Sequence, residues 1–258
     1  MPQTFNAQMV RALLDTAMLG NTIEFYEQVP STNDMAKAGA ATAAHGTVII
    51  ADRQTAGRGR FTRQFFSPQQ DGIYMSVMLK QGVRADTVGL LTSAAAVAVA
   101  RAIERLIHAT VHIKWVNDLL INDKKVCGIL TEASLAPDGT YDFAVIGIGI
   151  NVSTMQFPAE LDAIASSLLK ECGVCPDRAA LCATVLQELE TVLSDLESRA
   201  FLQESRTRSA VLGKDITVIC GDKRYTAHAL DIDNNGGLVV QTENGMHTLC
   251  SGEVSVRV

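Results

Sequence analysis

The sequence predicts an α+β protein in which a mixed or antiparallel sheet is flanked by helices and followed by a small C-terminal β-barrel. Between residues 111 and 150, four apolar segments are separated by short polar turns, and helical patterns come before and after them. Consecutive strands joined by tight turns favour antiparallel pairing over a doubly wound parallel sheet. Short alternating segments from residue 215 onward predict the barrel.

The first 80 residues alternate between helical and extended patterns. Helical spacing of apolar residues and small polar caps mark the helices, while β-branched runs mark the strands. The segment after the second strand is rich in Gly, Arg and Gln, which is typical of a loop. We expect a helix over 6–19, a strand over 23–29, a helix from Ser31 or Thr32 to about Ala44, a strand over 47–52, a loop over 53–72 and a strand over 73–80.

The middle of the chain places helices on both sides of a run of strands. The last of these helices carries leucine and valine residues at helical spacing, so one side of it should be buried. We expect a helix over 86–108, strands over 111–116, 118–122, 126–134 and 141–150, and helices over 160–170 and 178–205.

The pattern changes near residue 213, where short alternating strands begin. Hairpin-turn residues divide these strands at Gly221-Asp222, 234–237 and Asn244-Gly245. We therefore place a domain boundary near residue 210, with a larger domain over 1–210 and the barrel domain over 211–258.

Composition excludes several classes of protein. The chain has 258 residues, of which 47% are hydrophobic, so it is long and apolar enough to bury a core. Its net charge of −6 argues against a protein that coats nucleic acid. The most apolar stretch, 88–100, is shorter than the ~20 residues that span a membrane. With no secretory signal, we expect a cytoplasmic protein whose six cysteines are free thiols, including the pair Cys172 and Cys175.

Gly57-Arg58-Gly59-Arg60 lies in the expected loop, shortly after Gln54. Glycines let backbone N–H groups approach a ligand closely, and arginines supply fork-shaped charged donors for phosphate or carboxylate. An anion site is one interpretation of this segment. A solvated basic loop or a nucleic-acid-binding segment is the other.

A second segment, Lys114-Trp115-Val116-Asn117-Asp118, is followed by Lys125 at the start of an apolar strand. A lysine in such a strand is unfavourable unless an anion pairs with it. The alternative roles are core packing for Trp115, which is the only tryptophan, and an ordinary hairpin turn for Asn117-Asp118.

Two further segments carry polar or glycine residues at unusual places. Ser31-Thr32-Asn33 stands at a helix start, where small polar side chains cap the helix and can also face a ligand. In 146–152, glycines alternate with isoleucines in an apolar strand, which indicates that a backbone or flat ligand lies close. This pattern differs from the Gly-x-Gly-x-x-Gly fingerprint, so we expect no dinucleotide-binding fold.

In this order and spacing, the four segments resemble the catalytic domain of biotin protein ligases. The resemblance covers about residues 25–258, and the C-terminal part is similar to the family's SH3-like barrel. It implies a catalytic domain of the class II synthetase and biotin/lipoate ligase type. It also implies an enzyme that uses ATP, biotin and Mg²⁺ to make biotinyl-5′-AMP, and then transfers biotin to one lysine of a biotin carboxyl carrier protein.

The resemblance also implies roles for individual residues. Lys125 would bridge the biotin carboxylate and the α-phosphate, Arg60 would belong to a loop that closes over the adenylate, and Asp118 would orient the incoming lysine or Mg²⁺. No metal-ligand set of the protein's own is implied. The implied biotin contacts are Ser31, Thr32, Asn33, Gln54, Arg58, Gly59, Arg60, Lys125 and Gly128, and the implied ATP contacts are Arg58, Arg60, Phe65, Lys114, Asn117, Lys125 and Asn151.

The chain departs from the family pattern at three positions. Thr62 and Phe65 stand where the arginine loop usually has glycine and tryptophan, and Val116 replaces a proline. Residues 1–22 are also too few to form the DNA-binding domain that some members carry. We therefore expect a ligase that binds neither DNA nor membrane. A homodimer is compatible with the sequence, which does not select an oligomeric state.

Three other functions remain open at this point. A lipoate or octanoate ligase has a related catalytic fold, and loading with each acid would separate the two. A catalytically silent biotin-binding regulator would bind biotin without releasing pyrophosphate. Nucleic-acid binding through the arginine loop conflicts with the acidic charge, and it would be strongest at low salt.

Overall fold

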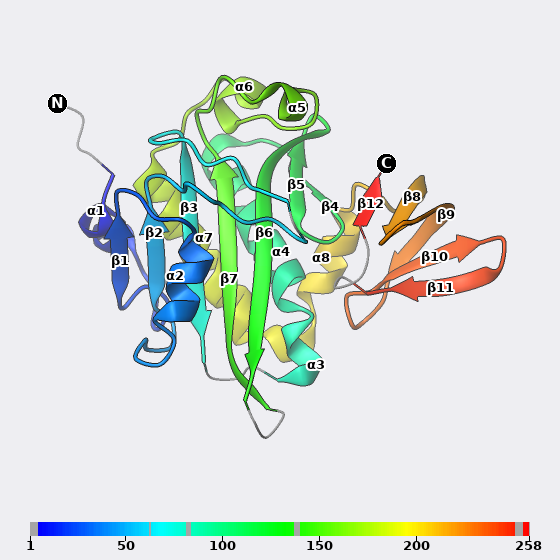
Figure 1. The fold of residues 1–258 in the computed structure, drawn as a ribbon, viewed down its shortest axis with the longest axis horizontal. Helices are drawn as coiled ribbons and strands as arrows, with labels where there is room; N and C mark the ends of the chain where they lie inside the picture. Colours follow the sequence, from blue (N-terminus) through cyan, green and yellow to red (C-terminus); the bar gives the residue numbers. More distant parts are fainter. Residues whose placement is uncertain (1–4, 62, 81–83, 137–139, 251–254, 258) are drawn as a thin grey trace.

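The computed structural model describes residues 5–61, 63–80, 84–136, 140–250 and 255–257. Its strands form a seven-stranded sheet, in the order β1-β2-β3-β7-β6-β5-β4, and a five-stranded sheet, in the order β11-β10-β9-β8-β12. Figure 1 shows the smaller sheet beside the β4 end of the larger one. The large sheet contains β1 (Ile23–Tyr26), β2 (Val48–Ala51), β3 (Gly72–Leu79), β4 (His112–Lys114), β5 (Asp118–Ile121), β6 (Lys124–Leu135) and β7 (Tyr141–Asn151), and the small one contains β8 (Asp215–Cys220), β9 (Lys223–Ile232), β10 (Leu238–Thr242), β11 (Gly245–Leu249) and β12 (Ser255–Arg257).

Pairing in the large sheet is mixed, which confirms the α+β class predicted from the sequence. Strands β1 and β2 run parallel, and every other neighbouring pair of described strands in this sheet is antiparallel. The pairs of the small sheet are all antiparallel among the described residues. The tight turns of the sequence therefore produced the expected hairpin connections.

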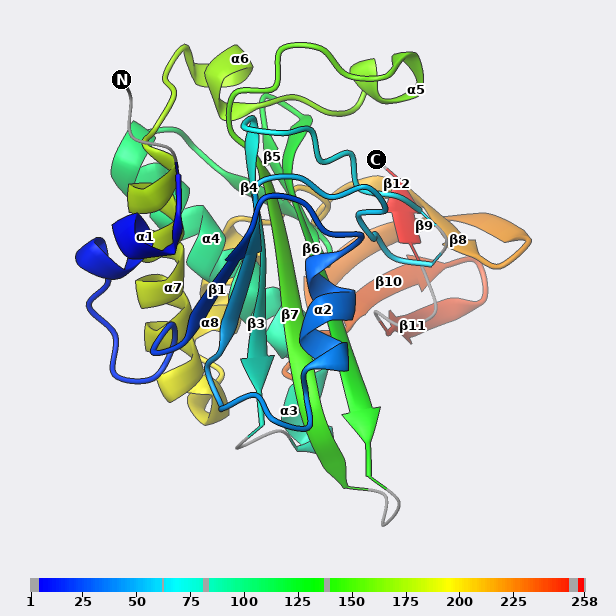
Figure 2. The ribbon, with the colours of Figure 1, turned by 60° about the vertical axis from the view of Figure 1, so that its left-hand side comes forward.

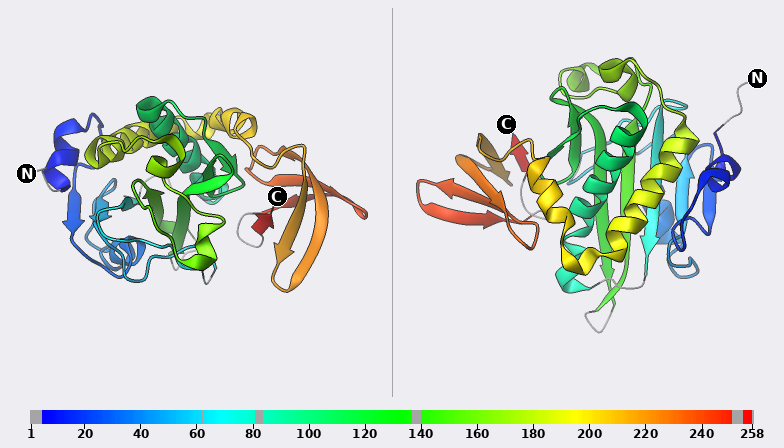
Figure 3. Two further views of the ribbon diagram at one scale, coloured as in Figure 1. Left: turned by 90° about the horizontal axis from the view of Figure 1, so that it is seen from above. Right: turned by 180° about the vertical axis from the view of Figure 1, so that it is seen from behind.

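Helices cover both faces of the large sheet. Two long helices lie across the back, as Figure 3 shows, and Figure 2 shows α2 on the opposite, front face. The back helix α4 is rich in alanines that are fully buried, which lets it pack closely against the sheet and α7. The helices are α1 (Ala7–Leu13), α2 (Thr32–Ala38), α3 (Ala85–Val88), α4 (Leu91–Ile107), α5 (Ala159–Asp162), α6 (Leu168–Cys172), α7 (Arg178–Ser194) and α8 (Phe201–Thr207), with a 3₁₀ turn at Leu196–Ser198.

Two expected helices were too long because groups elsewhere in the chain form hydrogen bonds with their backbone. The helix expected over 6–19 ends at Leu13, since the Glu190 carboxylate accepts hydrogen bonds from the backbone N–H groups of residues 17–19. The helix expected over 160–170 divides into α5 and α6. Between them, Ile164 and Ser166 bond to the backbone of Lys125 in the sheet.

Three more boundaries differ from the expectation. The helix starting at Ser31 ends at Ala38 and is capped by Gly39, a residue that disfavours helix by about 1 kcal/mol. The helix expected over 86–108 is interrupted at Gly89 and Leu90. The helix expected over 178–205 ends at Ser194, and the left-handed backbone of Arg199 separates it from α8.

The two faces of the central strand β7 differ in composition. Its isoleucines at 146, 148 and 150 belong to the main core, which also contains the buried face of α4. Its glycines at 147 and 149 alternate with these isoleucines and lie on the front face, beneath Asn33 and Phe65. The back of the sheet is therefore a packed apolar core, and the front has room for polar side chains.

Candidate active site

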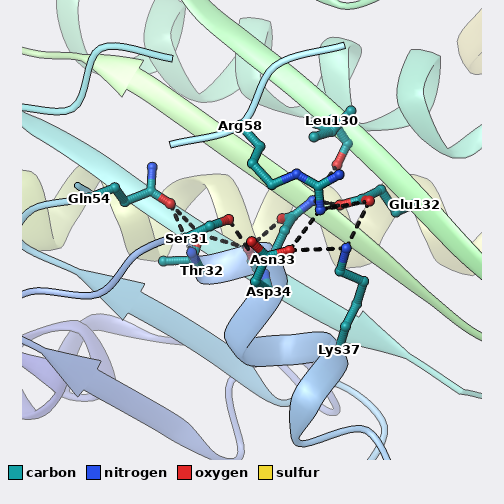
Figure 4. Close-up of polar contacts among 10 residues, drawn as sticks. Ser31, Thr32, Asn33, Asp34, Lys37, Gln54, Arg58, Leu130 and Glu132 are labelled. Atoms are coloured by element: carbon teal, nitrogen blue, oxygen red, sulfur yellow. Dashed lines mark hydrogen bonds and ion pairs between the residues drawn. The ribbon is translucent and has the colours of Figure 1, made fainter. Parts of the chain in front are cut away.

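The candidate site lies on the front of the large sheet, where four segments meet. The start of α2, the loop residues 53–61 and 63–71 and strands β6 and β7 surround it, and Figure 4 shows part of this arrangement. The sequence segments singled out above are far apart in the chain. The topology brings them together because β6 and β7 are neighbours in the centre of the sheet, while α2 packs over β3 and β7 and its Asn33 side chain bonds to β6.

At its N-terminus, α2 carries a buried hydrogen-bond network. The Ser31 hydroxyl accepts a bond from the backbone N–H of Asp34, so the predicted helix cap is confirmed. Thr32 and Asn33 are each only 4% exposed. The Gln54 carboxamide oxygen accepts from the backbone N–H of Thr32 at 2.8 Å, which ties the loop to the helix start.

A serine on β3 completes this network from below. The Ser76 hydroxyl lies 2.8 Å from the Thr32 hydroxyl and 2.6 Å from the Asn33 side-chain oxygen. The Asn33 amide group donates to Leu130 O and to the Glu132 carboxylate at 2.9 Å. These partners hold several small hydroxyl and amide groups in defined orientations, as recognition of an uncharged polar ring requires.

The glycines of the front face are required by close contacts. A Cβ atom on Gly147 would collide with the Asn33 side-chain oxygen, and one on Gly149 would lie 2.6 Å from the Phe65 ring. At Gly128, a Cβ would be 3.0 Å from both the Phe65 ring and Lys125 Nζ. The sequence predicted that a backbone or a flat ligand lies close to the glycine strand, and the groups that the structure places there are the side chains of Asn33 and Phe65.

Lys125 forms an ion pair with Asp118, with Nζ and Oδ1 2.7 Å apart. Both side chains are partly exposed, at 28% and 24%. The backbone of Lys125 is held on its N–H by Ile164 O and on its carbonyl by Ser166 N. This pairing explains how a lysine is accommodated at the start of an apolar strand, because a carboxylate neutralises it while its backbone is fixed.

The arginines of the loop have different surroundings. Arg60 donates to the Asn117 side-chain oxygen at 3.3 Å. Burial lowers the pKa of its guanidinium, although the nearby Asp118 carboxylate acts in the opposite direction. Arginine nevertheless stays charged at neutral pH. Arg60 therefore brings a partly buried positive charge close to Asn117 and Asp118, the residues beside Lys125.

Arg58 instead joins a cluster of four charged side chains: Asp34, Lys37, Arg58 and Glu132 (Figure 4). Its Nη1 donates to Asp34 Oδ1 at 2.7 Å and lies 3.1 Å from Glu132 Oε1. The hydrogen bond that Arg58 donates to the Asp34 carboxylate raises the pKa of the Arg58 guanidinium. The cluster anchors the loop to both α2 and β6.

The remaining predicted residues lie at the margins of this region. Lys114 ends β4 and is paired in register with Asp118, and Gly59 bonds through its N–H to Arg63 O. Asn151 ends β7 and donates to Ser166 O, while its own side-chain oxygen has no hydrogen-bond partner among the described residues. Thr62, one of the departures from the family pattern, lies outside the described residues.

Known proteins resemble this chain over nearly all of its length. The model of the biotin/lipoate A/B protein ligase family matches residues 25–151, and the biotin protein ligase C-terminal domain matches 211–257. A bifunctional ligase/repressor of Bacillus spizizenii is 34% identical over 99% of this chain and 80% of its own length. The biotin–[acetyl-CoA-carboxylase] ligase of Mycobacterium tuberculosis is 32% identical over 90% of this chain and 88% of its own.

This chain belongs to the biotin protein ligase family. The structure of the Aquifex aeolicus biotin protein ligase in complex with biotin and ATP agrees with this assignment. It matches with a TM-score of 0.80 at 28% identity, over 92% of this chain and 99% of that one. The predicted fold, including the SH3-like C-terminal domain, is confirmed by this similarity and by the match to the C-terminal domain.

In this ligase-family chain, sequence reasoning missed several residues that build the site. Ser76, Asp34, Ser67 and Glu132 all bond to predicted site residues, and Lys37 pairs with Asp34 and Glu132. Glu132 had a usable signal, because it is a charged residue in an otherwise apolar strand, as Lys125 is. The single Ser76 in β3 had no such signal.

Three other expectations concern features away from this site. All six cysteines are free, as predicted. Among the described residues, no set of three or more metal-binding side chains is arranged to hold an ion. None of the helices in the described part of the chain has the length and apolar character needed to cross a membrane.

We expect that Glu132→Gln will weaken the site without unfolding the protein. Glutamine keeps an oxygen that can accept from Asn33, but it removes the negative charge that holds Lys37 and Arg58. Hydrogen bonds to charged groups contribute ~1.5–3 kcal/mol, and partial exposure reduces this. The KM for the carboxylate substrate should therefore rise about tenfold in a pyrophosphate-release assay.

The matched control is Glu243→Gln, which removes an exposed carboxylate from the turn between β10 and β11. It should leave this KM unchanged. Equal effects of the two substitutions would show that Glu132 contributes only through overall charge.

Proposed function

We propose that this protein activates biotin with ATP to biotinyl-5′-AMP and then transfers the biotin to a lysine of a biotin carboxyl carrier protein. The observation that carries the proposal is the position of Lys125. Its ammonium group lies beside Gly128 and pairs with Asp118, and the neighbouring residue Asn117 accepts a hydrogen bond from the partly buried Arg60. That arrangement suits two anions that must react despite their mutual repulsion.

The polar network at the start of α2 is proposed to bind the biotin head. The ureido ring is uncharged and has both donors and acceptors, so it needs paired partners of both kinds. Ser31, Thr32, Asn33 and Gln54 provide them, and Ser76 is added to the residues expected from the sequence. Gly128 offers the backbone surface on which the ring system would lie.

Lys125 and the arginine loop are proposed to carry the chemistry. Lys125 would leave Asp118 and bridge the biotin carboxylate and the α-phosphate, where negative charge increases as the new bond forms. Arg58, Gly59 and Arg60 would close over the product and exclude water, which would otherwise hydrolyse the anhydride. In the second step, Asp118 would orient the incoming lysine amine.

The nucleotide is proposed to lie on the side of the site nearest β4 and the end of β7. Lys114 and Asn117 would face the phosphates together with Arg58, Arg60 and Lys125. Phe65 offers a ring for adenine stacking in place of the usual tryptophan. The buried Asn151 oxygen, which lacks a partner among the described residues, suits the exocyclic amine of adenine.

Mg²⁺ is proposed to enter with the nucleotide rather than to occupy a site built by the protein. Magnesium is often held by one or two carboxylates together with substrate phosphates. The Asp118 carboxylate, which accepts a hydrogen bond of 3.1 Å from the Asn117 side-chain nitrogen, would supply such an oxygen ligand. When bound, the ion would neutralise negative charge on the phosphate groups.

The acceptor protein is proposed to dock along the free edge of β6. Strand β5 pairs only with the first part of β6, up to Gly128, so no described strand pairs with residues 130–135 on that side. An unpaired edge is a common place for another chain to bind. The same edge would serve a second copy of this chain if the protein forms a homodimer.

We also propose the domain boundaries and the cellular location of the protein. Residues 1–210 would form the catalytic domain and 211–258 the C-terminal domain, since β8 begins at Asp215 in a separate sheet. A cytoplasmic location is supported by six cysteines without a disulfide.

Pyrophosphate release from the purified protein with Mg-ATP, measured with and without biotin, tests the proposed function. Biotin-dependent release followed by labelling of one lysine on a carrier domain would support it. Tight biotin binding without pyrophosphate release would instead indicate a silent regulator. Release of pyrophosphate with lipoate or octanoate but not with biotin would show that the protein activates one of those acids instead of biotin.

A further inference from the structure

A turn of the small sheet, Asp233–Gly237, has a tightly defined shape. The Asp233 carboxylate accepts hydrogen bonds from the backbone N–H groups of Asn235 and Gly237, each at 2.8 Å. The backbone N–H of Asp233 also donates to Gly237 O. Gly236 has a φ of +79°, a conformation that favours glycine. The turn is therefore a rigid unit rather than a flexible hairpin loop.

Two arginines next to or within α8 hold this turn against the large domain. Arg199 donates to Asn234 O and to the Asn235 side-chain oxygen. Arg206 donates to Ile232 O at 2.7 Å and to the carboxylate of Asp231. The turn is thus fastened to the large domain by several charge-assisted bonds, which are stronger than neutral ones.

At its tip, the turn contacts the core of the large domain. Gly236 is buried, and a Cβ built on it would lie 3.3 Å from the Leu90 side chain. Its carbonyl accepts a hydrogen bond of 3.0 Å from the indole N–H of Trp115. Trp115 is 3% exposed, so this bond is shielded from water, and loss of either partner would leave a buried polar group unsatisfied.

Trp115 belongs to the segment that supports the charged groups of the site. Asn117, two residues further along, accepts from Arg60 and bonds through its backbone oxygen to Ile129 N. Asp118 follows directly and holds Lys125. A shift of Trp115 would therefore move the partners of Arg60 and Lys125, whereas the network of Thr32 and Ser76 lies on other elements.

We propose that the turn Asp233–Gly237 is a positioning element of the active site, which acts through Trp115 to place Asn117 and Asp118. The proposal rests on the proposed function, because it assigns these residues to the nucleotide side of that reaction. In this proposal, the C-terminal domain contributes to ATP binding by holding Asn117 and Asp118 in place. Biotin recognition depends on the start of α2 and not on this turn.

Two variants test this inference from opposite sides of the contact. Trp115→Phe keeps an aromatic ring but removes the N–H that bonds to Gly236. Arg206→Gln loosens the turn from α8 and leaves Trp115 intact. Both should raise the KM for ATP about tenfold in the pyrophosphate-release assay, and the KM for biotin should stay within about twofold of the unmodified protein.

The control is Arg224→Gln, which removes an exposed charge from β9 of the same sheet and should change neither KM. If both test variants keep the original KM for ATP, or raise both KM values equally as the Tm falls, this inference is overturned and the proposed function stands. If the unmodified protein releases no pyrophosphate with biotin, the proposed function fails, and this inference fails with it.

Discussion

Replacing Lys125 with alanine is expected to slow biotinyl-adenylate formation about 10³-fold. Removal of a preorganised group that stabilises charge in a transition state commonly slows a reaction by ~10²–10³-fold, and Lys125 would face two anions at once. The measurement is single-turnover pyrophosphate release with saturating ATP and biotin. Single-turnover conditions report the chemical step rather than product release.

The fold should survive this substitution. Lys125 is partly exposed, and the ion pair that it forms with Asp118 is of a kind that contributes only ~0–1 kcal/mol. Lys124→Ala is the matched control, because it removes the neighbouring ammonium group, which donates to Ala163 O, away from Asp118. A full rate in Lys125→Ala, or an equal loss in Lys124→Ala, would refute the assignment of Lys125.

Arg60→Gly should let the activated intermediate escape from the enzyme. Arg60 connects the loop to Asn117, and a hydrogen bond from a charged donor contributes ~1.5–3 kcal/mol. We expect adenylate to dissociate roughly 10–100-fold faster, since each 1.4 kcal/mol is a factor of ten. Free biotinyl-adenylate would then label lysines on a bystander protein, which a biotin blot detects.

Arg63→Gly provides the comparison for loop flexibility. Arg63 is an exposed arginine in the same loop, and its backbone oxygen, which accepts from Gly59, is unaffected by the substitution. Bystander labelling by Arg60→Gly but not by Arg63→Gly would link the escape to the contact with Asn117. Similar labelling by the two variants would attribute it to added glycine flexibility alone.

Strands were predictable from the sequence to within a few residues, and helix ends were not. A strand is marked by its own β-branched residues and by adjacent turns, as Val48–Ala51 shows. A helix end often depends on distant partners. Glu190 captures the backbone after α1 from 171 residues away, and no local pattern reveals that contact.

The residues of the candidate site also fall into two groups, those that the sequence revealed and those that it did not. Residues in compact motifs, such as Arg58 and Arg60, were recognisable because several unusual residues stand together. Ser76 and Asp34 were not, since a lone serine in a strand and an acidic residue in a helix are common. Their roles arise from the register of β3 and β7 and from the packing of α2.

The alternation of glycine and isoleucine in β7 limits how this strand can change over evolutionary time. On the front, Gly147 and Gly149 reject even one added methyl group, because Asn33 and Phe65 occupy that space. On the back, removal of a methylene from Ile146 or Ile148 would open a cavity and destabilise the fold by ~0.5–1.5 kcal/mol. Substitutions on either face of β7 are therefore unfavourable. Neutral substitutions should accumulate in other parts of the sheet.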